Sequence, residues 1–236
     1  MAVIKYIRLP FSFNVTLLQQ EVNAMAEQHW QLHYQTRHYE GNWSAIPLRS
    51  INGDPGNIII APQENPVYED TIFLRNSNYL KQVLAEFKCP LLAVRLLKLN
   101  AGAVIKEHRD ADLAFESGEV RIHIPVQTND AVEFYLDKER MMLKEGECWY
   151  MNFNLPHSIY NKSNSDRIHL VIDAVVNDWV KDLFQQPGLL KKETADTGPD
   201  DETKRKIIAS LRELNTETGN RLAAEMEASL SLRTDN

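Results

Sequence analysis

Residues 91–176 carry many short hydrophobic or alternating runs with no helical pattern between them. The successive runs are LLAVRLLKL, AVIKEH, EVRIHIPVQ, AVEFYL, CWYMNF, HSIYN and RIHLVIDAVV. Turn-forming residues such as Asn100-Ala-Gly and Glu145-Gly separate them. Short strands at close spacing, joined by turns, are typical of an antiparallel sandwich or barrel. We therefore predict a mainly β fold, a jelly roll of two facing sheets whose open end can hold a ligand.

The first 90 residues have a mixed pattern that predicts two helices. One follows Asn14, a favourable N-cap, and has apolar residues at roughly helical spacing. The other begins near Ser77 and ends before Pro90, because the residue before a proline disfavours helix. Between them, residues 41–57 are rich in Gly, Asn and Pro and predict a loop. We expect residues 1–90 to form helical support for a jelly-roll core over 91–176.

The pattern changes again after residue 176. The run DWVKDLF predicts a short closing helix, and residues 187–202 are polar and typical of a linker. Residues 203–236 have the spacing of an amphipathic helix, with apolar positions at Ile207, Leu211, Leu214, Leu222, Met226 and Leu230. The predicted organisation is thus a domain over 1–186, a linker and a helical tail. The tail either packs on its own domain or forms a dimer or partner contact through 203–232.

Composition and charge exclude several classes of protein. The chain has 26 basic and 33 acidic residues, a net charge of −7, which argues against a nucleic-acid partner. Its hydrophobic content of 43% is too high for a disordered chain, yet no run is long enough to span a membrane. The N-terminus lacks the order of a signal peptide, and two distant cysteines form no disulfide framework. We expect a cytoplasmic protein without a membrane partner.

Three residues of the strand-rich region form a candidate metal site. His108 and Asp110 are two positions apart, so on an extended strand they point to the same side and can reach one ion. His157, on a later strand, can supply a third ligand. Two imidazoles and one carboxylate are the ligands of non-heme Fe(II) oxygenases, which leave positions open for a cosubstrate and O₂. This pattern predicts an Fe(II) site.

Two arginine–histidine pairs extend the candidate site. Arg167 follows His157 by ten residues, a spacing that brings it back beside His157 on an antiparallel hairpin, where its fork can bind the far carboxylate of a 2-oxo acid. The tripeptide RIH occurs at 121–123 and again at 167–169, each time with Arg and His on one face. Facing inward, these side chains would line an anion-binding cavity, because unpaired buried charge is costly. Facing outward, they would be solvated. His169 can also serve as a hydrogen-bonding support for other residues.

The order of these motifs resembles the aspartyl/asparaginyl β-hydroxylase family of Fe(II)/2-oxoglutarate oxygenases, with the bacterial free-proline hydroxylases as the most similar branch. The resemblance covers roughly residues 40–180. It rests on H-R-D at 108–110, R-I-H-I-P-V-Q-T-N at 121–129, G-E-C-W-Y-M-N at 146–152, L-P-H-S at 155–158 and R-I-H-L-V-I-D at 167–173.

The resemblance implies a double-stranded β-helix, the cupin-like form of the jelly roll, with His108, Asp110 and His157 holding iron. It implies that Arg167 binds the C5 carboxylate of 2-oxoglutarate and that Arg121 and His123 bind cosubstrate or substrate. Trp43 and Arg49 resemble a segment upstream of the site, where Arg49 would meet a substrate carboxylate. Alternatively, Trp43 belongs to the core and Arg49 pairs with a surface acid.

The predicted activity is hydroxylation of an unactivated C–H of an amino acid, either free or within a peptide or protein, with Fe(II), 2-oxoglutarate and O₂. Two other functions remain open at this point. A cupin-like metal isomerase or dioxygenase would need no 2-oxo acid, although such proteins often use an HxH pair that this chain lacks. A non-catalytic binding module would use the barrel for an acidic ligand and the tail for a partner.

Overall fold

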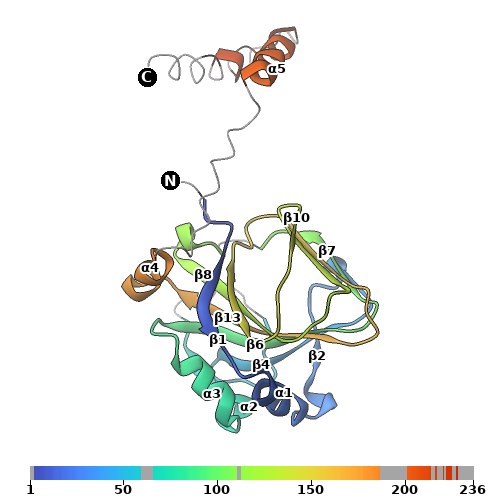
Figure 1. Cartoon of the computed structure of the whole chain (residues 1–236), viewed down its shortest axis with the longest axis vertical. Helices are drawn as coiled ribbons and strands as arrows, with labels where there is room; N and C mark the ends of the chain where they lie inside the picture. Colours follow the sequence, from blue (N-terminus) through green and yellow to red (C-terminus); the bar gives the residue numbers. More distant parts are fainter. Residues whose placement is uncertain are drawn as a thin grey trace. The chain divides into compact units, whose positions relative to one another are not determined.

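The computed structural model describes residues 3–59, 66–110, 113–186 and 201–213, together with residues 216, 220, 222–224 and 227. The chain separates into two units, Met1–Lys191 and Lys192–Asn236, and each is described by itself. Two antiparallel sheets dominate the first unit (Figure 1). Among the described helices, none is long and apolar enough to cross a membrane.

The larger sheet has eight strands in the order β1-β11-β8-β13-β6-β4-β2, with β5 paired to β4. Its strands are β1 (Tyr6–Ser12), β11 (Glu147–Met151), β8 (Glu119–Gln127), β13 (Arg167–Val175), β6 (Leu91–Leu99), β4 (Trp43–Ile51), β2 (Gln31–Leu32) and β5 (Tyr68–Asp70). The smaller sheet has five strands in the order β10-β9-β12-β7-β3. Its strands are β10 (Glu139–Met141), β9 (Val132–Leu136), β12 (His157–Asn161), β7 (Val104–His108) and β3 (Tyr39–Glu40). The two sheets form the predicted jelly roll.

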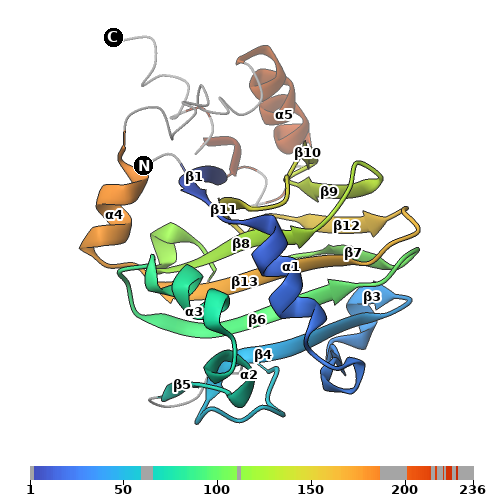
Figure 2. The ribbon, with the colours of Figure 1, turned by 60° about the horizontal axis from the view of Figure 1, so that its bottom comes forward.

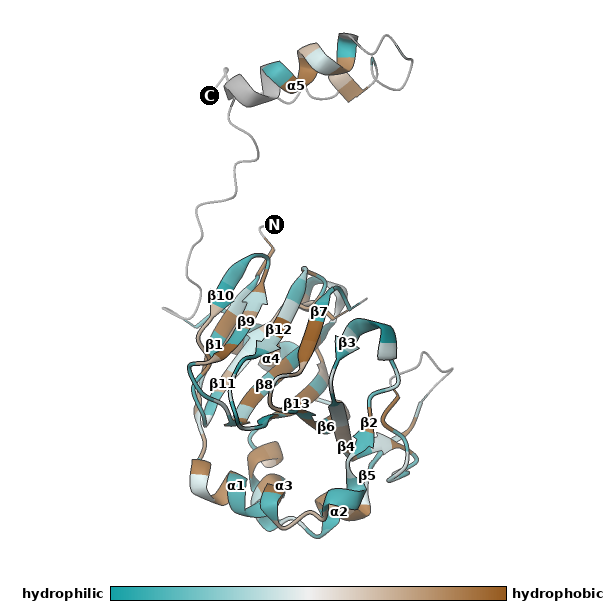
Figure 3. Ribbon diagram, turned by 90° about the vertical axis from the view of Figure 1, so that its right-hand side faces the viewer, coloured by the Kyte–Doolittle hydropathy of each residue, from teal (hydrophilic) through white to brown (hydrophobic). Residues whose placement is uncertain are grey.

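Three helices cover the outer face of the large sheet, namely α1 (Val15–Asn23), α2 (Ile72–Arg75) and α3 (Asn78–Ala85). Figure 2 shows α1 and α3 lying across the sheet, and Figure 3 shows the small sheet, the large sheet and the helices as successive layers. The Asn14 side chain accepts a hydrogen bond from Leu17 N and so caps α1. A fourth helix, α4 (Asp178–Phe184), follows β13, and three short 3-10 turns lie at Glu27–His29, Thr36–His38 and Phe115–Ser117. Both N-terminal helices and the closing helix form where the sequence predicts them.

The central strands bury both of their faces, and the two faces have different tasks. Alternate residues of β6, β8 and β13, such as Leu96, Ile122 and Leu170, pack with the helices in one hydrophobic cluster. The residues between them point into the space between the sheets, where Leu97 and Val171 belong to a second cluster. Because side chains alternate along a strand, the same parity sends Arg95, His123 and Asp173 inward.

The structure corrects two predictions about the first 90 residues. Residues 41–57 do not form one loop, because β4 runs from Trp43 to Ile51 and is almost entirely buried between β6 and its neighbours β2 and β5. Residues 1–90 also contribute five strands to the two sheets and are therefore part of the jelly roll as well as its helical support. The sequence pattern did not predict β4 because turn-forming residues lie at both of its ends. Gly41 precedes the strand, and Asn52 and Gly53 follow it, all with positive φ.

The helical tail differs from a single continuous helix. Helix α5 spans Asp201–Glu213, and Arg212 forms an ion pair with Glu227 at 2.8 Å. Fifteen residues of unbroken helix would separate these two by about 22 Å, so Arg212 and Glu227 do not belong to one continuous helix. Ile208 and Ala223 are buried, whereas Ile207 and Leu222 are partly exposed. Of the predicted linker over 187–202, residues 187–200 lie outside the described residues and the last two belong to α5, which begins at Asp201 and not at residue 203 as predicted. The predicted apolar positions Leu214, Met226 and Leu230 also lie outside the described residues.

An aromatic stack joins β2 to β4 at the rim of the barrel. The His33 ring lies parallel to the Trp43 indole, with ring centroids 3.6 Å apart, and His33 N donates to Trp43 O. The Tyr34 ring also stacks on the His33 ring, with centroids 4.7 Å apart. Burial is the main cause that lowers the pKa of His33 to about 3, with the Arg95 charge adding to it. His33 is therefore neutral throughout the physiological range.

Gly146 is a position where the fold requires glycine. Its φ is +76°, and a Cβ there would lie 2.5 Å from Phe13 O, the chain segment that links β1 to α1. We expect Gly146→Ala to destabilise the domain by more than about 1 kcal/mol, because both the backbone conformation and the close approach oppose a side chain. Urea unfolding measures this. Gly102→Ala is the matched control, since Gly102 also has positive φ but nothing within 4 Å of a Cβ. Equal losses in the two variants would contradict the argument.

The buried imidazole of His33 predicts a pH dependence of stability. Below about pH 6.5 the unfolded chain protonates His33 while the folded chain does not, so this contribution is present above pH 6.5 and is lost as the pH falls towards 3. His33→Phe keeps the stack and removes the titration. Between pH 6.5 and 5.5 we expect the variant to lose about 1 kcal/mol less unfolding free energy than the wild type. Urea unfolding followed by circular dichroism tests this, and identical losses would refute it.

Candidate metal centre and ligand cavity

A cavity of about 690 Å³ lies inside the jelly roll, with residues of both sheets in its wall. The charged residues that line it are Arg95, Arg109, Asp110, Glu119, Arg121, Arg167 and Asp173. Four arginines thus face three acids, and the lining has an excess of positive charge. His108, His123 and His157 line the same cavity.

The structure brings His108, Asp110 and His157 together. His108 ends β7 and is the Cα partner of His157, the first residue of β12, while Asp110 follows two residues after His108. One potential ligand atom from each residue lies within 4.8 Å of the others. The Asp110 backbone N–H donates to Phe153 O at 2.9 Å, which fixes the position of the loop that carries the carboxylate.

Both histidines of this group are oriented by backbone carbonyls. His108 Nδ1 lies 2.7 Å from Lys106 O, and His157 Nδ1 lies 3.1 Å from Leu155 O. A carbonyl only accepts, so each Nδ1 carries the proton and each Nε2 presents a lone pair. Burial and the neighbouring His108 lower the pKa of His157 to about 4, which keeps it neutral. Two bare Nε2 atoms and a carboxylate fit a divalent transition metal.

Arg121 determines the state of Asp110. Its Nη1 donates to one oxygen of Asp110, and the other oxygen lies 3.6 Å from His108 Nε2. Burial opposes ionisation of Asp110, but the charge of Arg121 and the two imidazoles outweigh it and lower the pKa of this carboxyl. Asp110 is therefore an anion with one oxygen committed to Arg121 and one facing the histidines.

A second carboxylate, Asp173, lies between two buried arginines. Arg121 Nε and Nη2 donate to its two oxygens at 2.6 and 3.0 Å, a bidentate pair. Arg95 Nη2 donates to the same carboxylate at 3.2 Å. All three side chains are at least nine-tenths buried. Ion pairs therefore connect Arg95, Asp173, Arg121 and Asp110 in one continuous chain, and Asp110 at its end lies beside His108.

Among the residues that the structure describes, Arg167 is a buried cation that no carboxylate contacts. It is 2% exposed, its Nε has no hydrogen-bond partner, and its guanidinium lies 5.6 Å from the centre of the Phe134 ring. Burial lowers its pKa to about 9, and among the described residues no carboxylate offsets this effect. A guanidinium in such a place costs free energy until an anion binds to it.

Arg167 also sets the tautomers of two buried histidines. Its Nη2 donates to His169 Nδ1 at 3.1 Å, because a guanidinium cannot accept. His169 Nδ1 is 3.3 Å from His123 Nδ1, so His123 must supply the proton of that contact. Burial, with the Arg167 charge second, holds the pKa of both histidines well below the usual value. His123 Nε2 is buried, has no partner, and belongs to a residue that lines the cavity.

Seven of the nine predicted site residues line this cavity, and the other two, Arg49 and His169, do not. Trp43 lines it and also packs in the inner hydrophobic cluster, so it belongs to the core, and a contact between Trp43 and substrate stays a prediction. Arg49 is not in the lining: its Nη1 pairs with Asp70 at 2.5 Å, and its other donors bond Leu91 O and Tyr68 O. Arg49 thus pairs with an acid at the surface, the alternative that the sequence left open, and each nitrogen of its fork has a partner, which opposes the predicted contact with a substrate carboxylate.

Arg121 likewise donates from all three of its nitrogens to Asp110 and Asp173. It therefore positions Asp110 beside His108 and His157, and the predicted contact between Arg121 and a bound cosubstrate or substrate stays a prediction. Sequence reasoning missed the part played by Asp173, although it stands on the same face as Arg167 and His169 by strand alternation. It also missed His33, which no spacing pattern marks.

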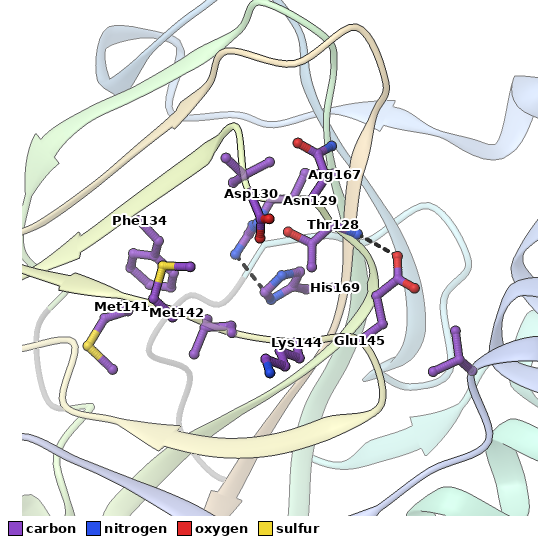
Figure 4. Close-up of a pocket in the computed structure, with 13 residues that line it drawn as sticks. Thr128, Asn129, Asp130, Phe134, Met141, Met142, Lys144, Glu145, Arg167 and His169 are labelled. Carbon is purple, nitrogen blue, oxygen red and sulfur yellow. Dashed lines mark hydrogen bonds between the residues drawn. The ribbon is translucent and has the colours of Figure 1, made fainter.

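A second cavity, of about 530 Å³, opens on the other side of Arg167. Arg167 and His169 contribute to its wall, and Figure 4 shows the hydrogen bond between them. Its remaining lining is apolar near Phe134 and Met141 and polar near Asn129 and Lys144. Arg167 is therefore shared between two hollows of the barrel.

Comparisons with known proteins agree with this geometry. The family model for aspartyl/asparaginyl β-hydroxylases matches residues 12–176, well over half of the chain, and confirms the resemblance seen in the motifs. An L-proline cis-4-hydroxylase from Rhizobium meliloti is 27% identical over 135 residues, which are 56% of this chain and 48% of that protein. The chain thus spans about half the length of this curated relative.

A solved prolyl-4-hydroxylase from Pseudomonas putida is 11% identical, with a TM-score of 0.49 over 74% of this chain and 94% of the other. The family match runs from the last residue of β1 to the end of β13 and includes His108, Asp110 and His157. The chain belongs to the aspartyl/asparaginyl β-hydroxylase family.

Proposed function

We propose that this protein is an Fe(II)- and 2-oxoglutarate-dependent hydroxylase that acts on an unactivated C–H bond of an amino acid. The observation that carries the proposal is the unpaired, buried Arg167 in the same cavity as His108, Asp110 and His157. Family membership and the L-proline cis-4-hydroxylase relative support the hydroxylase class. The 2-oxo acid is inferred from the chemistry of the cavity.

His108 Nε2, His157 Nε2 and one oxygen of Asp110 would hold the iron. Their orientation is set before metal arrives, by Lys106 O, Leu155 O and Arg121. The bound iron would supply O₂ activation coupled to oxidative decarboxylation of 2-oxoglutarate, the chemistry of this ligand set. The protein's contribution is to position the reactants and to keep water away from them.

Arg167 would bind the distal carboxylate of 2-oxoglutarate. Its fork matches a carboxylate with two parallel hydrogen bonds, and the apolar surroundings near Phe134 make that pairing strong. His123, which the sequence predicts to bind the cosubstrate, lies next to this position. With its proton on Nδ1 its Nε2 can only accept, so His123 would support Arg167 through His169 and would not donate to the carboxylate. His169 would hold both side chains in place through its Nδ1.

Hydrophobic residues would form the walls that exclude water from the reaction. The Phe153 ring stacks on His123, with centroids 4.9 Å apart, and meets His157 edge-on at 4.7 Å. Trp43 and Leu97 close the wall formed by the large sheet. These contacts fix the rings around the metal group, so the cavity is shaped before a ligand enters.

The first test of this function is spectroscopic and needs no substrate. We expect the wild-type protein, given Fe(II) and 2-oxoglutarate without O₂, to develop the weak visible charge-transfer band of a chelated 2-oxo acid. His157→Ala should abolish the band, because one of three iron ligands is lost. Iron binding without any effect of 2-oxoglutarate would favour a cupin-like enzyme, and failure to bind iron would overturn the proposal.

A second test separates the cosubstrate site from the iron site. We expect Arg167→Met to retain iron while weakening 2-oxoglutarate binding by roughly 10- to 100-fold, the usual worth of a bond to a charged group. Titration of the visible band with 2-oxoglutarate measures it. Arg49→Met is the matched control, because Arg49 lies outside the cavity lining, and it should bind 2-oxoglutarate as the wild type does. Unchanged affinity in Arg167→Met would contradict the assignment.

A further inference from the structure

The second cavity, on the other side of Arg167, is separate from the metal group. Its volume is about 530 Å³, and His108, Asp110 and His157 do not line it. Among the described residues, Arg167 is the only one in the walls of both cavities. The proposed hydroxylase chemistry takes place in the first cavity and gives the second cavity no role.

The second cavity is polar and exposed at its mouth and mostly apolar further in. The exposed residues of its lining are Asn129, Asp130, Met142 and Lys144, and the buried ones are Val132, Phe134, Met141, Arg167 and His169. Figure 4 shows Phe134 and the two methionines gathered on one side of the pocket. A ligand that enters from solvent therefore meets an apolar wall and, at the buried end, the nitrogens of Arg167 and His169.

His169 offers the second cavity a hydrogen-bond donor. Its Nδ1 accepts from Arg167 Nη2 at 3.1 Å and lies 3.3 Å from His123 Nδ1, which supplies the proton of that contact. Burial and the Arg167 charge hold the pKa of His169 well below its usual value, so the ring is neutral and its single proton is on Nε2. This N–H has no hydrogen-bond partner among the described residues, and His169 does not line the first cavity. It is therefore available to a ligand of the second cavity.

Arg167 supplies the positive charge at the same end of the second cavity. Its Nε has no hydrogen-bond partner, and its Nη2 holds His169. An anion at this end would therefore receive hydrogen bonds from two buried side chains, one of them charged. A small inorganic anion would leave the wall formed by Val132, Phe134 and Met141 in contact with water, which is unfavourable. An anion that carries a hydrocarbon chain matches both the nitrogens and the wall.

We propose that the second cavity binds a monocarboxylate with an unbranched alkyl chain. Its carboxylate accepts from Arg167 and from His169 Nε2, and its chain lies along Val132, Phe134 and Met141 towards the mouth. This site is distinct from the metal centre, and its existence does not depend on the reaction that takes place there.

Occupancy of the second cavity should oppose binding of the cosubstrate, and this part of the inference rests on the proposed function. One guanidinium would then face two carboxylates, which repel each other in a buried place. The two aspartates at Arg121 differ from this case, because Arg95 also pairs with Asp173. We expect the bound monocarboxylate to weaken 2-oxoglutarate binding roughly 5- to 100-fold, the usual range of coupling between two sites.

The first experiment is calorimetry on the metal-free full chain, titrated with acetate, butyrate, hexanoate and hexanamide. We expect affinity to rise roughly threefold for each CH₂ that the wall buries, because every methylene leaves water. Hexanamide should bind roughly 10- to 100-fold more weakly than hexanoate, because it has no charge to pair with Arg167. Neither iron nor 2-oxoglutarate is present, so the result is independent of the proposed function.

A variant that fills the second cavity locates the site. Leu143 lines this cavity and not the first, so Leu143→Trp should weaken hexanoate binding at least roughly 10-fold, while 2-oxoglutarate alone titrates the visible band as in the wild type. Leu143→Phe, a smaller change, should give a smaller loss and serves if the tryptophan variant fails to fold. Leu17→Trp is the matched control, because Leu17 lines neither cavity, and it should bind hexanoate normally.

Three results would overturn the site. They are the absence of hexanoate binding, equal affinities for hexanoate and either acetate or hexanamide, and hexanoate binding to Leu143→Trp at wild-type affinity, which would place the ligand in the first cavity. A 2-oxoglutarate titration unchanged by saturating hexanoate would overturn the antagonism. Absence of the 2-oxoglutarate band in the wild type would overturn the proposed function and the antagonism with it, whereas the calorimetric result decides the site by itself.

Discussion

The site depends on one guanidinium, that of Arg121, which holds two aspartates apart and in place. It binds both oxygens of Asp173 and one oxygen of Asp110. Without it, two carboxylates in a buried cavity would repel each other, and Asp110 would lose the charge that keeps its pKa low. Asp110 lies with His108 and His157, and Asp173 contacts Arg95. Arg121 therefore connects these two parts of the cavity wall.

So many charged side chains fit between the sheets because the opposite faces of the same strands are hydrophobic. The faces of β6, β8 and β13 that carry Leu96, Ile122 and Leu170 pack on α1 and α3, and this burial stabilises the sheet. The inner faces are then free to carry polar groups that contribute little or nothing to stability. The helices outside the barrel thus make a polar interior possible, and each charged group inside it is either paired or left for a ligand.

The polar interior is graded along β13. Arg167 and His169 stand at the beginning of the strand and Asp173 near its end, all on the inner face, with Val171 between them. Charged groups of one strand therefore face the cavity at two depths, while the smaller sheet supplies His108 from β7 and His157 from β12. Division of these tasks between two facing sheets explains why the reactive groups meet only inside the closed jelly roll.

By itself, the sequence determined the features that depend on local pattern. The jelly roll, α1 with its Asn14 cap, α3, α4 and the shared face of Arg and His within each RIH tripeptide follow from periodicity of two or 3.6 residues and from turn chemistry. The sequence left open whether that face points inward. The grouping of His108, Asp110 and His157 was also predicted, from the two-residue spacing of His108 and Asp110 and a third ligand on a later strand, although Asp110 lies in the loop directly after β7.

Only the tertiary structure decided which arginine is free. In the sequence, nothing distinguishes Arg49, Arg95, Arg121 and Arg167. In the structure Arg49 pairs with Asp70, and Arg121 pairs with Asp110 and Asp173. Arg95 and Arg167 each keep an Nε without a hydrogen-bond partner among the described residues. Strand β4 was likewise concealed, because its buried neighbours lie far away in the chain. Ion pairing and burial are set by contacts between distant segments, and no local pattern carries that information.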